Sequence, residues 1–146
     1  INFHATLFIF IIPFFFARIV MMLGNWTQHA FVDLNNLEDN TINCINTKYN
    51  QACWNDGYHA VHHVRPALHY TEIPGQFLKN KEYYVKQKTL TFDGIHYLHI
   101  FIWLMTKRYD KLAKHVVNVD NMFANDEEVI ALMKERTKKY TPPVIA

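Results

Sequence analysis

An unbroken apolar segment near the N-terminus constrains this chain more than any other feature. It runs from Phe3 to Leu23 and reads FHATLFIFIIPFFFARIVMML, close to the roughly 20 residues that a helix needs to cross the hydrocarbon core of a bilayer. The stretch from Phe8 to Phe16 has no polar face, which argues against the alternative of a buried core helix in a soluble protein. We therefore predict a transmembrane helix within residues 1–24 and a region outside the membrane over residues 25–146.

Two residues inside the apolar segment bear on its geometry. Pro13 lacks an amide N–H and should kink the helix, which membrane helices tolerate. Arg18 is costly in a bilayer unless it lies near the surface, where its side chain can reach the headgroups, so we place the cytosolic end of the helix near Arg18. The later lysines and arginines agree, because positive charge beside a span favours the cytosolic side.

Net charge, the start of the apolar segment and the cysteines exclude several possible classes of function and segment. The formal net charge is only +2 and the basic residues are dispersed, so nothing indicates nucleic-acid binding. The chain enters the apolar segment directly, without a preceding basic stretch or a following small-residue cleavage site, and so differs from a signal peptide. Cys44 and Cys53 do not form a CxxC motif, and we expect both to be reduced thiols.

The remainder of the chain is predicted to be helical, which makes the fold class all-α. The stretch with Asn35, Asn36, Asp39, Asn40 and Asn43 lacks apolar periodicity and is predicted to be a loop. Helices are predicted over residues 51–64, 76–88, 93–105 and 126–140, and the first should end before Pro66. The helix over 93–105 is apolar but too short to span, so it should pack on the protein or lie in the membrane interface.

Three histidines within five residues form the sharpest motif, with His59, His62 and His63 in the pattern HxxHH. On a helix this spacing places the imidazoles on one face, with neighbouring Cβ atoms about 5–6 Å apart, so they can converge on a metal ion. Imidazole suits iron, zinc and copper. A ligating ring usually donates its other N–H to a carboxylate, a role within reach of Asp56, one turn upstream. The alternative is a polar helix face that happens to contain histidines.

A second motif, Asn25-Trp26-Thr27-Gln28-His29, directly follows the apolar segment. If the helix continues, Asn25 and His29 lie one turn apart on the same face, where the helix leaves the bilayer. His29 then offers a further nitrogen ligand, and the Asn25 side-chain oxygen could hold a metal-bound water. Alone, such a pair is more typical of an interfacial position. Together with the HxxHH motif it predicts a shared metal site.

These motifs resemble the C-terminal half of the integral-membrane fatty acid desaturase and hydroxylase superfamily. The resemblance rests on the segments GNWTQHAF, NDGYHAVHHVRPALHYTEIP and MTKRYDKLAKH and covers most of the chain. His59, His62 and His63 are similar to the third histidine box of that family, and Asn25 and His29 to the extra ligand after its last membrane helix. The resemblance implies a site for two iron ions (a diiron centre) with His29, His59, His62 and His63 as ligands and Asn25 acting through a water.

The resemblance also implies an activity. The complete enzyme would use O2 and supplied electrons to desaturate or hydroxylate the chain of a fatty acyl lipid or acyl-CoA. The sequence contains no haem-binding HPGG segment, so a separate b-type cytochrome or ferredoxin would donate the electrons. The site would lie on the cytosolic face of an integral membrane protein, in the endoplasmic reticulum if the protein is eukaryotic. Two earlier histidine boxes of the family are not in this sequence, so we expect a fragment of a multi-span membrane protein that is inactive alone.

Two other functions remain open from the residues themselves. One is a zinc-dependent membrane hydrolase of amides or esters, in which His59, His62 and His63 hold one metal and its bound water attacks the substrate. The other is a non-catalytic membrane protein that keeps a vestigial histidine site. His96 and His99 have a helical spacing but no carboxylate between them, so they are not predicted to be ligands.

Overall fold

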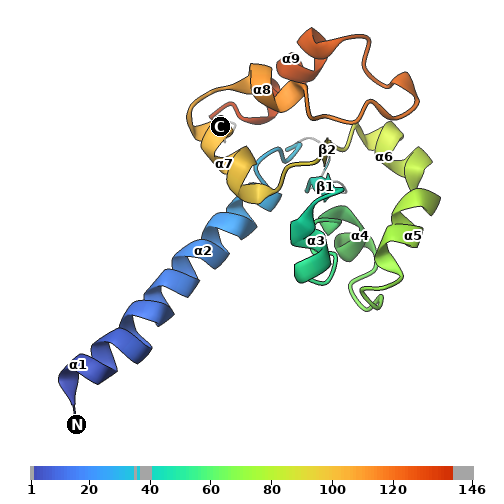
Figure 1. Cartoon of the computed structure of the whole chain (residues 1–146). Coiled ribbons are helices and arrows are strands. Elements are labelled where there is room, and N and C mark those ends of the chain that lie inside the picture. Colours follow the sequence, from blue (N-terminus) through green and yellow to red (C-terminus); the bar gives the residue numbers. More distant parts are fainter. Residues whose placement is uncertain (1, 35, 37–40, 140–146) are drawn as a thin grey trace, which may run out of the picture.

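A long N-terminal helix projects from the folded remainder of the chain (Figure 1). The computed structural model describes residues 2–34, 36 and 41–139. The long helix consists of α1 (Phe3–Thr6), the π-helical turn η1 (Leu7–Ile11) and α2 (Ile12–Gln28). Together these elements give 26 continuous residues, long and apolar enough to cross a membrane, and the most apolar window is 0% buried within the protein. The helix thus continues beyond Leu23 and includes Asn25.

The π-helical turn lies directly before Pro13, where the sequence predicted a kink. The N–H of Ile12 donates to the carbonyl of Leu7, five residues earlier. Because proline has no N–H and its ring crowds the carbonyl of the preceding turn, a wider turn at this point lets the helix pass the proline. Pro13 therefore alters the hydrogen-bond register of the helix without ending it.

Two short parallel strands join distant parts of the chain. They are β1 (Asn43–Ile45) and β2 (Thr91–Asp93), with Cys44 opposite Phe92. Between them lie α3 (Lys48–Ala52), α4 (His59–Val64), α5 (Ile73–Lys79) and α6 (Lys81–Gln87), and after them come α7 (Tyr97–Met105), α8 (Tyr109–Ala113), η2 (Val119–Asn121) and α9 (Asp126–Arg136). The prediction of a mostly helical chain with one candidate membrane helix is confirmed, and the short sheet is an addition to it.

The predicted loop between the membrane helix and the HxxHH motif is wrong at Asn43. Asn43 is fully buried in β1, where its Oδ1 accepts from the Ala60 N–H at 3.1 Å and its Nδ2 donates to Thr91 Oγ1 at 3.4 Å. These partners satisfy a buried amide that would otherwise be costly. Of the other loop residues, Asn35, Asp39 and Asn40 lie outside the described residues.

The helix predicted over residues 51–64 is wrong, because two helices occupy this region. The first, α3, ends at Ala52, and α4 begins only at His59. Between them Trp54 and Asn55 have φ of 49° and 60°, left-handed values that a helix cannot contain. Asp56 therefore lies in a turn rather than on the helix. The predicted end is right, since α4 stops at Val64, before Pro66.

The other predicted helices are shorter than expected. Residues 76–88 divide into α5 and α6 at Asn80, and residues 93–96 precede α7 rather than belong to it. The last helix, α9, ends at Arg136, and Tyr140 lies outside the described residues. Asn125 caps the start of α9, because its side chain accepts from the N–H of Glu128.

Two apolar clusters fix these elements. The larger cluster surrounds the strand pair and includes Phe31, Phe92, Ile100 and Met133. The smaller cluster consists of Ala60, Val61, Ile73 and Tyr84, and so holds α4 against α5 and α6. Because Ala60 and Val61 are buried between His59 and His62, the packing of this short helix determines where the HxxHH rings point.

Candidate metal centre

Three histidines from two distant segments come together in the folded chain. One ligating atom from each of His29, His59 and His63 lies within 4.8 Å of the others. Their ring centroids are 5.3 Å apart for His29 and His59, 5.0 Å for His29 and His63, and 4.8 Å for His59 and His63. The Nε2 atoms of His59 and His63 are 3.2 Å apart. Such a group offers three imidazole nitrogens to one point, which is what a metal ion requires.

Local backbone structure explains how this group forms. His29 directly follows the last residue of α2, and its N–H donates to the carbonyl of Trp26 at 3.2 Å. The carbonyl of Gln28 accepts from the N–H of Ile42 at 3.0 Å, which ties the end of α2 to the chain just before β1. Asn43 in β1 in turn accepts from the first turn of α4. The end of α2 and the HxxHH motif are therefore linked through β1.

Burial and the neighbouring rings favour neutral imidazoles at His59 and His63. His59 is only 8% exposed, and its pKa is lowered to about 3, first by burial and then by the neighbouring His63, His29 and His62. The pKa of His63 is also lowered, by burial and then by His29 and His62. Burial disfavours the charged form of an imidazole. Neutral rings keep the lone pairs that bind metal ions.

Asp56 connects the histidine group to three other elements. Its Oδ2 accepts from Tyr49 Oη at 2.8 Å and from Gln28 Nε2 at 3.1 Å, and Tyr97 Oη donates to its backbone carbonyl at 2.9 Å. Its Oδ1 lies 3.9 Å from His59 Nδ1. That nitrogen is buried and has no hydrogen-bond partner within the part of the chain that the structure describes, so Asp56 is the nearby group that can orient the ring.

The arrangement around His59 fits a ligating histidine. Its Nε2 faces His63, whereas its Nδ1 faces the Asp56 carboxylate. With a proton on Nδ1 directed at the carboxylate, Nε2 carries the free lone pair toward His29 and His63. The residues present therefore suit a metal ion such as iron or zinc.

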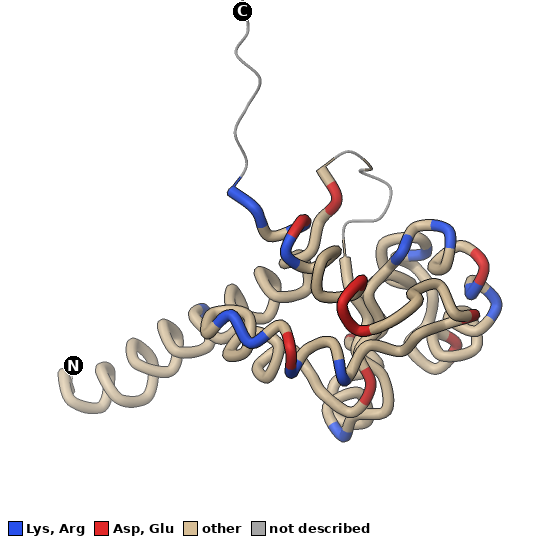
Figure 2. Tube along the Cα trace, turned by 90° about the horizontal axis from the view of Figure 1, so that it is seen from above, with Lys and Arg blue, Asp and Glu red and all other residues tan. Residues whose placement is uncertain are grey.

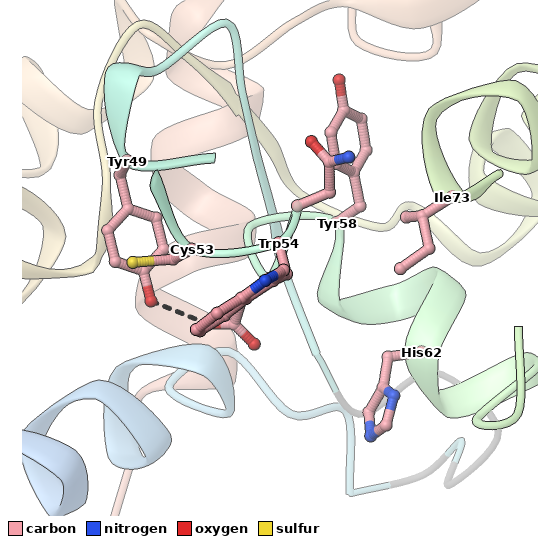
Figure 3. A pocket seen from close by; sticks show the side chains of 8 residues that line it. Tyr49, Cys53, Trp54, Tyr58, His62 and Ile73 are labelled. Atoms are coloured by element: carbon pink, nitrogen blue, oxygen red, sulfur yellow. Dashed lines mark hydrogen bonds between the residues drawn. The ribbon is translucent and has the colours of Figure 1, made fainter. Parts of the chain in front are cut away.

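His62 lies outside the group of three. Its ring centroid is 5.6 Å from that of His59 and 6.1 Å from that of His63. Figure 3 shows His62 at a cavity whose opposite side carries Tyr49, Cys53 and Trp54. This cavity has a volume of about 400 Å³, and Asp56 also lines it. His62 is thus placed beside the group rather than in it.

Asn25 lies at a different cavity, which Asp56 also lines. It lines a second cavity, of about 300 Å³, together with Gln28, Tyr49, Asp56 and Tyr97. Tyr49 and Asp56 border both cavities. The structure therefore brings His29, His59 and His63 together and leaves Asn25 and His62 at two adjacent cavities that share Tyr49 and Asp56.

Sequence reasoning missed the partners of Asp56. Gln28, Tyr49 and Tyr97 come from the end of α2, from α3 and from α7, and no spacing in the sequence relates them. The remaining histidines have other contacts. His96 caps α7, because its Nδ1 accepts from the Leu98 N–H at 3.3 Å, and His115 Nδ1 lies 3.0 Å from the carbonyl oxygen of Asp93.

A helix able to span a membrane, with a three-histidine group at its end, defines a candidate metal-binding membrane protein. The family model for fatty acid desaturases matches residues 1–94, and the chain belongs to this family. The match includes His29 and the HxxHH motif and ends before α7. No curated protein and no solved structure matches the chain. Family membership indicates a desaturase-like oxidoreductase that is associated with a membrane and uses iron, O2 and a fatty acyl substrate.

Proposed function

We propose that this chain supplies histidine ligands to the two-iron centre of a membrane fatty acid desaturase or hydroxylase. The observation that carries the proposal is the group of His29, His59 and His63, whose ligating atoms lie within 4.8 Å of one another at the end of the membrane helix. The group uses only imidazole nitrogens, which bind iron well.

Each candidate ligand has a part in this proposal. His29, His59 and His63 hold one iron, and His62, at the adjacent cavity, offers a nitrogen to the second. Asn25 acts through a water from the cavity that it lines together with Asp56. Four histidines leave the ligand shells of two irons incomplete, so further ligands must come from another chain or from sequence outside residues 1–146. These 146 residues alone are therefore expected to be inactive.

Bound iron would supply the O2 reduction and the attack on an unactivated C–H bond, chemistry that acid–base side chains cannot provide. The chain's own residues hold and orient the ligands. Asp56 keeps the proton of His59 on Nδ1, and the Gln28 and Tyr49 hydrogen bonds keep the carboxylate in place. Burial of His59 excludes water from its side of the group.

The proposed setting follows from the same features. Residues 1–24 form a transmembrane segment, and residues 25–146 form a helical region at the cytosolic face, in the endoplasmic reticulum if the protein is eukaryotic. Arg18, in the C-terminal part of the long helix, and the later basic residues favour this orientation. The substrate is a fatty acyl lipid or acyl-CoA, and a separate b-type cytochrome or ferredoxin delivers the electrons.

An anaerobic Fe(II) titration of the chain in detergent tests the proposal. His59→Ala and His63→Ala should each weaken the tightest binding by at least about 100-fold, more than the loss of an outer hydrogen-bond partner costs. His69→Ala is the matched control, because His69 is exposed and bonded to Thr71, away from the group. Equal binding by all four proteins would refute the proposal. In the full-length protein, His62→Ala should also abolish the desaturation of lipid acyl chains, measured as the lipid unsaturation that the wild type produces.

A zinc-dependent hydrolase is the second candidate, because three histidines around one point also match a catalytic zinc site. Metal analysis of the purified full-length protein separates the two functions. Two irons per chain support the oxygenase, and one zinc per chain supports the hydrolase.

A further inference from the structure

Helix α7 has apolar side chains on two opposite faces. Tyr97, Ile100 and Leu104 are buried in the larger cluster. On the other side Leu98, Ile102 and Met105 are 49%, 48% and 60% exposed. The i, i+4 and i+7 spacing aligns these three side chains in one stripe along the helix. Apart from the exposed His99, α7 consists of apolar and aromatic residues. A helix with apolar faces on two sides is normally covered on both, so the exposed stripe requires a partner.

The exposed stripe lies next to the membrane helix. Figure 1 shows α7 beside the C-terminal end of α2, and the two helices pack against each other. Their contact includes the rings of Trp26 and Phe101, with centroids 5.7 Å apart. On α2 the neighbouring Met22 is 59% exposed and Trp26 is 47% exposed. The apolar surface of α7 is therefore continuous with that of a helix that spans the membrane.

The residues at the end of α7 suit the boundary between membrane and water. Figure 2 shows that the N-terminal helix is almost free of charge and that charged residues gather on the remainder of the chain. Lys107 and Arg108 lie two and three residues after the end of α7 and are exposed, although Arg108 also pairs with Asp110 at 2.9 Å. Lys111 Nζ lies 5.7 Å from the ring centroid of Trp103. Tryptophan and basic side chains are typical of the interfacial layer.

We propose that α7 lies in the membrane interface where α2 leaves the bilayer, with Leu98, Ile102 and Met105 among the lipid acyl chains. The occupant of the exposed stripe is thus lipid, and the chain has a second membrane contact besides its spanning helix. The family model matches residues 1–94, which do not include α7. The proposal does not depend on metal binding.

This contact has a consequence for the histidine group. Tyr97, on the buried face of α7, donates to the carbonyl of Asp56, and the carboxylate of Asp56 faces His59. An α7 that is seated in the interface therefore sets the position of the turn that carries Asp56 relative to the membrane surface.

Spin labels on α7 test the proposal in the whole chain, reconstituted into phosphatidylcholine vesicles. The background is Cys53→Ser, because Cys44 is buried. A nitroxide is attached in turn at Leu98→Cys and Ile102→Cys, with Ile9→Cys in the spanning helix and Glu127→Cys on α9 as references. Both α7 positions are exposed, so the labels remove no core contact. Frequent collisions of a label with O2 indicate that it lies among lipid chains, and frequent collisions with a water-soluble nickel complex indicate that it lies in water.

For nitroxides at Leu98→Cys and Ile102→Cys we expect strong broadening of the label's spectrum by O2 and weak broadening by the nickel complex, as for Ile9→Cys. For Glu127→Cys we expect weak broadening by O2 and strong broadening by the nickel complex. Strong nickel accessibility at both α7 positions would place the stripe in water and overturn the proposal. Immobile labels shielded from both reagents would also overturn it, because protein, including a second copy of the chain, would then cover the stripe. A nickel-accessible label at Ile9→Cys would overturn it by removing the span on which it depends.

Discussion

Asp56→Asn should weaken metal binding although Asp56 is not one of the candidate ligands. The aspartate accepts hydrogen bonds from Tyr49 and Gln28 and lies 3.9 Å from His59 Nδ1. Asparagine keeps the shape and one acceptor oxygen but replaces the other oxygen with an NH2 donor. A donor facing His59 favours the tautomer with its proton on Nε2, the atom that faces His63. That proton occupies the lone pair needed for the metal.

The size of the effect follows from this geometry. Loss of an outer-shell partner costs about 10- to 100-fold in metal affinity, equal to about 1.4 to 2.8 kcal/mol. The Asp56 side chain is 43% exposed, and its 3.9 Å separation from His59 is longer than a hydrogen bond, so solvent screens part of the interaction. We therefore expect the lower end of the range, about tenfold. Tyr49→Phe removes one donor but keeps the charge, and should have a smaller effect.

The assay is an anaerobic Fe(II) titration in competition with a chelator of known affinity. Asp93→Asn is the matched control, because Asp93 also accepts a side-chain hydrogen bond, from Asn46 at 2.6 Å, but its carboxylate is not part of the histidine group. Circular dichroism spectra should be the same for all variants. If Asp56→Asn binds iron as tightly as the wild type and Asp93→Asn, the proposed orientation of His59 by Asp56 is refuted.

Three further predictions concern packing, pH and thiol reactivity. A Cβ on Gly57 would collide with the Asn50 side chain and the Cys44 carbonyl, whereas one on Gly75 meets open space. Urea unfolding should show a loss of about 1–3 kcal/mol in stability for Gly57→Ala and a change of at most about 1 kcal/mol for Gly75→Ala. Equal stabilities of the two variants would contradict the close packing of Gly57 in the turn before α4. His59 has a pKa lowered from 6.5 to about 3 by burial and its histidine neighbours, so the unfolded chain takes up its proton first. The metal-free protein should lose stability as the pH falls from about 6.5 toward 3, and His59→Gln should flatten that part of the profile of urea midpoints. Burial raises the pKa of Cys44, so iodoacetamide should modify the half-buried Cys53 first, as mass spectrometry of the labelled peptides can establish.

The features that the sequence predicts well depend on local chemistry. The long N-terminal helix follows from an apolar run alone, and α4 ends where Pro66 restricts the preceding residue. The features that failed depend on contacts between distant residues. Asn43 joins a strand because Ala60 and Thr91 satisfy its amide. The helix over 51–64 breaks because Trp54 and Asn55 adopt positive φ, which no periodicity signals.

The HxxHH motif also shows that spacing in the sequence does not predict contacts with distant residues. Consecutive residues on an α-helix are about 100° apart, so His62 and His63 lie on opposite flanks of the direction in which His59 points. His59 and His63, which are spaced i, i+4, lie beside His29, whereas His62 lines the neighbouring cavity. The spacing thus identified the three histidines as a cluster on one helix. It could not predict that His59 and His63 face His29 while His62 faces the cavity, because the position of His29 depends on the fold.

Asp56 explains why a six-residue helix can hold such a group in place. The helix α4 is too short to be stable alone, so its orientation must come from tertiary contacts. The smaller apolar cluster supplies one such contact, through Ala60 and Val61. The turn that precedes α4 supplies the other, because Asp56 bonds to the end of α2 through Gln28 and to α7 through Tyr97. His29 at the end of α2 and His59 at the start of α4 are thereby held by contacts to the same turn, the one that carries Asp56. Two of the three elements that anchor this turn, α2 and α7, are the ones whose apolar surfaces we assign to the membrane.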